Sequence, residues 1–228
     1  MAKLLLPTNP GGDFPTLRAG SYLAICDMVV FLGLQEGTGA FPKARVQLYV
    51  RFEIPSQRAK WEKDGKQFDQ PAVIGNFYTA SMNHKSTLRK HLESWRGRQF
   101  TELEAGAFDV ATILGRPCMI SVTQSPGDGG KTYSNLAGVA AIPREFGAQK
   151  LVAELPLILY TPEASESYNL LPEWLRKKID NQILEQPPAS GPDPGEPRSG
   201  PDGWDGAMPN YDTIARQTEI TDDDIPFS

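Results

Sequence analysis

The sequence predicts a mainly β domain that ends in a helix and is followed by a long polar tail. Residues 44–54 alternate between apolar and polar side chains, with the two-residue period of a half-buried strand. Further runs of β-branched and aromatic residues are separated by turn-forming glycine and proline. The last 43 residues, 186–228, hold eight prolines, five glycines and few large aliphatic residues, a composition that cannot pack into a core.

The first half of the domain is predicted to contain three strands. Residues 21–34 form a long apolar run that ends in glycines, and residues 44–54 form the alternating strand. Residues 55–70 are polar and are predicted to be a loop, and residues 72–82 form a third strand that Gly75 weakens. The polar face of the second strand carries Arg45, Gln47, Tyr49, Arg51 and Glu53.

The second half begins with a helix. Residues 85–96 repeat apolar residues at helical spacing, with Ser86 or Asn83 as the N-cap and Gly97 at the end. The elements predicted after it are a short helical turn at 108–114, strands at 117–124 and 131–142, a further strand within 151–160 and a closing helix at 171–184.

Three strands, a helix and two more strands follow one another in the order of an OB-type barrel. In that five-stranded barrel the helix lies between the third and fourth strands. We therefore expect an OB-fold-like domain at residues 1–185, a disordered Pro/Gly-rich linker at 186–215 and an acidic tail tip at 216–228.

Charge is distributed unevenly between the domain and the tail. Residues 1–186 hold 21 Lys and Arg against 19 Asp and Glu, a net charge of +2, whereas residues 187–228 hold 2 against 9, a net charge of −7. A slightly basic body with an acidic tail indicates a polyanion-binding body whose tail competes for the same surface.

Other features favour a soluble protein of the cytoplasm. Cys26 and Cys118 lie far apart in strand-like contexts, which predicts buried thiols in a reducing compartment. The apolar run within residues 1–7 is too short for a signal or membrane segment.

We find no motif that predicts an enzyme, a cofactor or a metal site. The Gly-Asp-Gly-Gly-Lys-Thr sequence at 127–132 imitates a phosphate-binding loop, but it joins two predicted strands and has no helix after it. His84 and His91 are seven residues apart, so they cannot chelate one metal as an i, i+4 pair does, and they are expected at the surface.

Several residues have the chemistry that single-stranded DNA requires, namely cations for phosphates and flat rings for stacking bases. On the second strand Tyr49 lies between Arg45 and Arg51, and the alternative is an ordinary solvated face. Phe77 and Tyr78 point to opposite faces of the third strand, so at most one ring is exposed. The remaining candidates are Lys60, Trp61, Lys63 and Lys66 in the predicted loop, Arg89, Arg96 and Arg98 on or after the helix, and Lys131 and Tyr133 at the fifth strand.

These candidates have alternative interpretations. Trp61 could instead fold back on the barrel, and the basic residues of the helix could be only its solvated side. The apolar stripe of the same helix is predicted to be core.

The chain closes with three acidic residues that run into an apolar tip. A run of like charge stays solvated, and an apolar tip on it suits a pocket with a basic rim. The expected partner-binding residues are Asp222, Asp223, Asp224, Ile225, Pro226 and Phe227. This sequence resembles the C-terminal tip of bacterial and phage single-stranded DNA-binding proteins, although Ser228 follows Phe227 here.

The resemblance implies a protein that coats single-stranded DNA and recruits replication, recombination or repair enzymes through its tail. Two alternatives remain open on the sequence. One is a non-enzymatic adaptor of a phage replication or recombination module, and the other is a recombination nuclease. The oligomeric state is not determined by the sequence.

Overall fold

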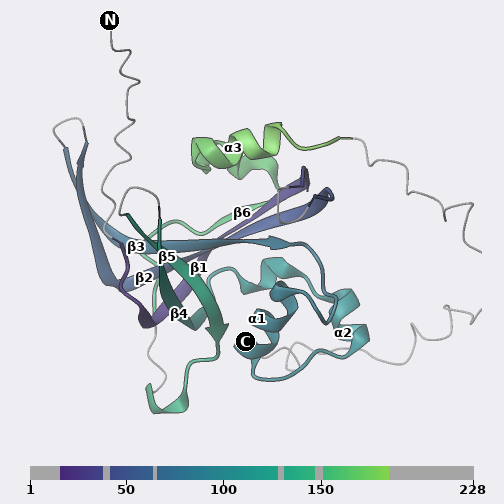
Figure 1. Ribbon diagram of the computed structural model, residues 1–228, viewed down its shortest axis with the longest axis horizontal. Coiled ribbons are helices and arrows are strands. Elements are labelled where there is room, and N and C mark those ends of the chain that lie inside the picture. Colours follow the sequence, from purple (N-terminus) through teal and green to yellow (C-terminus); the bar gives the residue numbers. More distant parts are fainter. Residues whose placement is uncertain (1–15, 38–41, 64–65, 128–130, 147–150, 185–228) are drawn as a thin grey trace, which may run out of the picture.

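The computed structural model describes residues 16–37, 42–63, 66–127, 131–146 and 151–184. The predicted linker and acidic tip, with the partner-binding residues from Asp222 to Phe227, lie outside the described residues. The described chain forms a curled antiparallel half-barrel with few helices (Figure 1), which confirms the mainly β fold class.

The half-barrel has the strand order of the predicted OB-type fold. Its five main strands are β1 (Gly20–Gln35), β2 (Arg45–Lys63), β3 (Lys66–Thr79), β4 (Pro117–Pro126) and β5 (Thr132–Ala140). They pair in the order β3-β2-β1-β4-β5, and the two end strands contact each other. The first part of β1 pairs with β4 and its second part with β2. One long central strand therefore joins the two parts of the curled sheet.

Helix α1 (Thr87–Arg96) lies between β3 and β4 in the chain, as predicted. Ser86, one of the two predicted caps, accepts a hydrogen bond from the Arg89 backbone N–H at 3.2 Å, and Gly97 ends the helix in the left-handed region at φ 72°. The apolar stripe of α1 packs against the sheet, where the Trp95 and Phe52 rings lie 5.8 Å apart. The stripe is therefore core, as predicted.

Two short helical segments follow α1. The 3₁₀ turn Val110–Ile113 lies within the predicted helical turn. Helix α2 (Glu102–Ala107) was not predicted, because six residues are too few for an apolar period to show. Its signal was the capping box, in which Thr101 and Glu104 each bond the other's backbone N–H.

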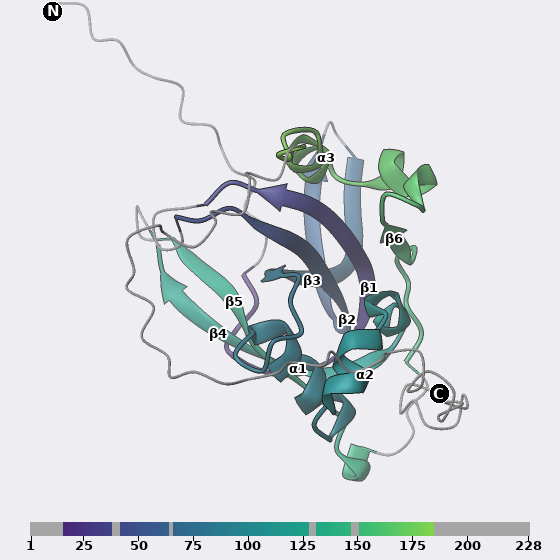
Figure 2. The same ribbon diagram turned by 90° about the vertical axis from the view of Figure 1, so that its right-hand side faces the viewer.

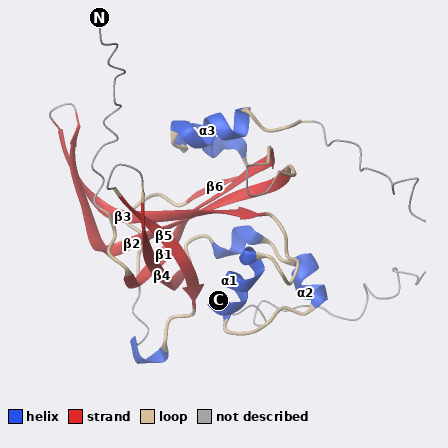
Figure 3. Ribbon diagram, in the orientation of Figure 1, coloured by secondary structure: helices blue, strands red, loops and turns tan. Residues whose placement is uncertain are grey.

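A second apolar layer covers the outer face of the sheet. Strand β6 (Ile158–Tyr160) pairs in parallel with β1, and helix α3 (Glu173–Asp180) packs above it. Leu175 and Ile179 of α3 bury the side chains of Met28, Val30 and Leu32 on β1. Figures 1 and 2 show α3 on the opposite side of the sheet from α1, and Figure 3 shows helices on both sides.

The predicted loop at residues 55–70 is wrong. After a register shift between Ile54 and Arg58, β2 and β3 continue as one long hairpin whose ladder runs from Arg58 opposite Pro71 to Lys63 opposite Lys66. Asp69 accepts a hydrogen bond from Arg58 at 2.8 Å. Among the described side chains of residues 58–70, only Ala59 and Phe68 are apolar and half-buried, and the others are polar and exposed, so this part of the hairpin has no sustained apolar period that could reveal it.

Candidate functional site

Three aromatic rings gather where α3 meets the outer face of the sheet. Tyr49 on β2 lies 5.1 Å from Phe77 on β3 and 5.2 Å from Trp174 on α3, and Phe77 and Trp174 are 6.0 Å apart, measured between ring centroids. Phe77 is 43% exposed and Trp174 is 45% exposed, whereas Tyr49 is only 8% exposed. The expectation of an exposed Tyr49 is therefore wrong, because α3 covers this ring.

Gly75 is what allows Tyr49 to lie flat across β3. A Cβ atom at position 75 would stand 2.0 Å from the Tyr49 hydroxyl oxygen and 2.3 Å from the Cζ atom of its ring. Burial of this ring raises the pKa of Tyr49 to about 12. Tyr49 thus forms the floor on which the two exposed rings, Phe77 and Trp174, rest.

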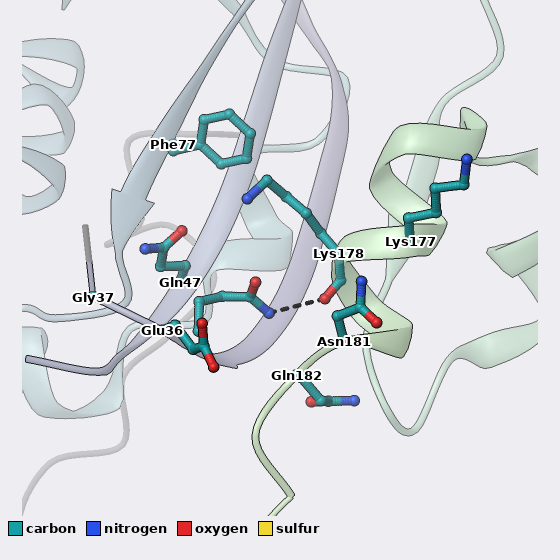
Figure 4. Close-up of a pocket in the computed structure, with 9 residues that line it drawn as sticks. Glu36, Gly37, Gln47, Phe77, Lys177, Lys178, Asn181 and Gln182 are labelled. Atoms are coloured by element: carbon teal, nitrogen blue, oxygen red, sulfur yellow. Dashed lines mark hydrogen bonds between the residues drawn. The ribbon is translucent and has the colours of Figure 1, made fainter. Parts of the chain in front are cut away.

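A groove of about 860 Å³ opens beside these rings, between α3 and the ends of β1, β2 and β3 (Figure 4). Its walls include Gln47, Phe77, Lys177, Lys178, Asn181 and Gln182. The Gln35 side chain donates to the carbonyl oxygens of Leu32 at 2.6 Å and Lys178 at 3.0 Å, which ties β1 to α3. We call this space the α3 groove.

One cation lies at the aromatic surface of the α3 groove. The Lys178 Nζ is 5.2 Å from the centroid of the Phe77 ring. An exposed cation–π contact of this kind contributes about 0.5–1 kcal/mol, whereas stacking of a nucleic-acid base on an aromatic side chain contributes about 1–3 kcal/mol. A base can therefore displace the ammonium from the ring and leave it available for a phosphate.

Arg51 has a structural partner instead of a solvent-facing position. Its Nε and Nη2 donate to Asp27 Oδ2 at 2.9 and 2.6 Å, and Asp27 is completely buried. Burial raises the pKa of Asp27, and the bond from Arg51 opposes that rise. The expected solvated cation at Arg51 is therefore wrong. Arg45 is partly exposed and lies 3.5 Å from Thr79 Oγ1.

Two of the candidate cations on α1, Arg89 and Arg96, do not face solvent, so neither alternative given for them holds. The Arg89 side chain is buried, where it bonds the carboxylates of Glu93 and Glu102. The buried Arg96 side chain bonds Glu104, and its guanidinium lies over the Phe100 ring. The pKa of Glu104 falls to about 2, chiefly through the hydrogen bond from Arg96. These cations hold α2 against α1, and sequence reasoning missed them because it did not find α2.

Arg98 and the two candidates at the β4–β5 turn remain at the surface. The half-exposed Arg98 also pairs with Glu104. Tyr133 is exposed, with its ring over Gly127, and Lys131 is exposed beside it.

The hairpin candidates are placed by their backbone. Lys60 is exposed and pairs with Asp69 at 3.3 Å. Trp61 lies within β2 opposite Phe68, and Lys63 and Lys66 close the hairpin ladder. The side chains of these last three candidates lie outside the described part.

Sequence reasoning missed the contribution of α3 to this surface. Trp174 was assigned with Leu175, Ile179 and Ile183 to the apolar stripe of the closing helix, yet nearly half of its surface is exposed. The available signal was the sequence Trp-Leu-Arg-Lys-Lys at 174–178. Consecutive helical residues point about 100° apart, so Trp174 and the residues that follow it in this run cannot all face the core.

Comparison with known proteins finds no matching family model and no match among the curated proteins. Within the described ranges, no group of three or more His, Cys, Asp and Glu side chains is placed to hold a metal ion. No helix in the part of the chain that the structure covers is long and apolar enough to cross a membrane.

Proposed function

We propose that this chain is a non-enzymatic single-stranded DNA-binding protein, with the α3 groove as the centre of its binding surface. The observation that carries the proposal is the pair of half-exposed rings, Phe77 and Trp174, next to the Lys178 ammonium. Exposed rings beside cations are what sequence-tolerant binding of a single strand requires.

The place of the α3 groove on the fold supports the same proposal. OB-type barrels bind oligonucleotides across the face of strands 2 and 3, between the loop that follows strand 1 and the loop between strands 4 and 5. The groove contains Gln47 of β2, Phe77 of β3 and Glu36 at the end of β1. Tyr133 and Lys131 lie at the β4–β5 turn and extend the proposed surface.

Binding in this groove selects for unpaired bases. A nucleic-acid base can stack on Phe77 or Trp174 only after it has separated from the bases next to it in its own strand. In a duplex this separation costs energy. Lys178 then leaves Phe77 and pairs with a phosphate of the same strand. Because such pairs release counterions, we expect the affinity to fall as salt rises.

The acidic tail is proposed to recruit partner enzymes. The support is the resemblance of Asp222–Phe227 to the tip of single-stranded DNA-binding proteins, together with the net charge of −7 on residues 187–228. The same charge opposes the approach of DNA to the body. In this proposal the chain coats exposed strands during replication, recombination or repair, in the cytoplasm of a phage host.

Removing residues 187–228 tests both parts of the proposed function. The truncated chain should bind a single-stranded oligonucleotide as tightly as the full chain or more tightly, because a net charge of −7 leaves with the tail. It should no longer retain host replication enzymes that the full chain retains on a column. A truncated chain that has lost its DNA affinity would contradict a groove in the body.

A further inference from the structure

A buried carboxylate on β2 holds the segment that leads into the outer layer of the fold. Glu53 lies on the same face of β2 as Tyr49 and Arg51, and it is completely buried. Its two carboxylate oxygens accept hydrogen bonds from the backbone N–H groups of Glu154 at 2.8 Å and Leu155 at 2.9 Å. Burial of a carboxylate is costly unless its oxygens are bonded. The two contacts therefore fix where this segment crosses the sheet.

The residues that follow Leu155 form one wall of the α3 groove. Strand β6 begins at Ile158 and pairs with β1, and α3 comes next with Trp174 and Lys178. We call residues 151–184, which form the second apolar layer, the α3 layer. Apolar packing of this layer on β1 is not directional, whereas two hydrogen bonds to one carboxylate set both a position and an orientation.

Polar groups tie the α3 layer to the sheet at both of its ends. Glu53 holds the beginning of the layer, and at its other end the Ile183 N–H donates to the Leu34 carbonyl oxygen at 2.8 Å. Between these ends lie the β6 ladder and the apolar contacts of Leu175 and Ile179. A short strand and a helix of eight residues form a small unit that can open while the rest of the fold stays intact. Weakening one end should therefore loosen the whole layer.

We infer that Glu53 is a positioning residue of the proposed DNA-binding surface. It does not line the α3 groove, but it holds the layer that places Trp174 and Lys178 beside Phe77. This inference rests on the proposed function and adds a residue that acts on binding through the α3 layer. The role requires a carboxylate, because a Gln side chain has one acceptor oxygen and its amino group would face the second backbone N–H.

Hydrogen exchange of the full-length Glu53→Gln variant, followed by NMR, tests whether the carboxylate holds the α3 layer. The Ile183 amide should exchange about tenfold faster or more than in the unchanged chain, the equivalent of one lost hydrogen bond to a charged group. Amides of α1, which lies on the other side of the sheet (Figure 2), should keep their exchange rates. This measurement needs no nucleic acid.

The affinity for a fluorescent single-stranded oligonucleotide at low salt tests whether Glu53 acts on binding. Glu53→Gln should lower this affinity about three- to tenfold, because the Trp174 ring is no longer held in place for stacking. In a chain that already carries Trp174→Ala and Lys178→Ala, adding Glu53→Gln should change the affinity by less than about twofold, since the groups that Glu53 positions are gone.

Glu154→Gln is the matched control. It removes the same charge from an exposed side-chain pair with Arg58 but keeps the backbone N–H that Glu53 binds. Exchange of the Ile183 amide and oligonucleotide affinity should both stay within about twofold of the unchanged chain.

Unchanged exchange at Ile183 in Glu53→Gln, or equal acceleration in α1, overturns the inference. An affinity that does not fall, or that falls equally with and without Trp174 and Lys178, also overturns it, because Glu53 would then not act through the α3 layer. If the unchanged chain binds no oligonucleotide, the proposed function fails, whereas exchange at Ile183 still decides whether Glu53 holds the layer.

Discussion

Phe77→Ala should weaken single-stranded DNA binding by about 5- to 150-fold, the equivalent of the roughly 1–3 kcal/mol that one stacked base contributes. Phe77 is 43% exposed and rests on Tyr49, so its truncation removes the stacking surface but leaves the floor of the α3 groove in place. The measurement is the dissociation constant of a fluorescent oligonucleotide at low salt, with the melting temperature recorded for each variant.

Two further variants make this result specific. Phe77→Trp should keep most of the affinity, because indole also stacks on bases. Phe146→Ala removes a ring that is 46% exposed but does not line the α3 groove, and it should leave the affinity unchanged. Equal losses from Phe77→Ala and Phe146→Ala would place the binding surface elsewhere.

Arg51→Met should lower the free energy of unfolding by about 3 kcal/mol, because it leaves the carboxylate of Asp27 buried without its partner. Asp27 is fully buried, and Arg51 is its charged hydrogen-bond donor. Urea denaturation measures the loss. Lys60→Met on the same strand, where the side chain is solvated, should cost less than about 0.5 kcal/mol.

The deficit of Arg51→Met, which is the free energy of unfolding that the variant loses, should become smaller as the pH falls. Burial holds the pKa of Asp27 above its usual value in the folded chain, so ionised Asp27 opposes folding and protonation relieves that cost. The deficit should therefore be smaller at about pH 5 than at about pH 8. Adding Asp27→Asn should recover part of the lost stability at the higher pH. A deficit that is independent of pH and of Asp27 would contradict this account of the pair.

The strands and helices that bury one face were predictable from the sequence. The alternating run at 44–54 and the stripe on α1 both display a period because one side meets the core. The extension of β2 and β3 beyond Ile54 was not predictable, because its mostly polar side chains show no sustained apolar period. The packing of α3 on β1 was indicated by the unbroken apolar run at 28–32. Such a run is typical of a strand whose two faces are both buried.

The candidate site was only partly predictable for a related reason. Chemistry alone identified Phe77, but it also selected Tyr49 and Arg51, whose exposure depends on what packs above them. Leu175 and Ile179 bring α3 onto the outer face, and that packing buries Tyr49 while it adds Trp174 and Lys178 to the surface. The sequence indicated apolar surfaces on β1 and on α3, but nothing local to Tyr49 or Arg51 indicated that these two surfaces meet above them.

Competition between a single strand and a duplex of the same sequence, measured at low and at high salt, tests the central claim most directly. The full chain should bind the single strand much more tightly than the duplex, and its affinity should fall steeply as salt rises. If the chain were a protein–protein adaptor, it would bind neither the single strand nor the duplex. If it were a nuclease, it would degrade the probe when a divalent metal is added. Equal affinity for single strand and duplex, or affinity that is insensitive to salt, would contradict single-strand binding by the α3 groove.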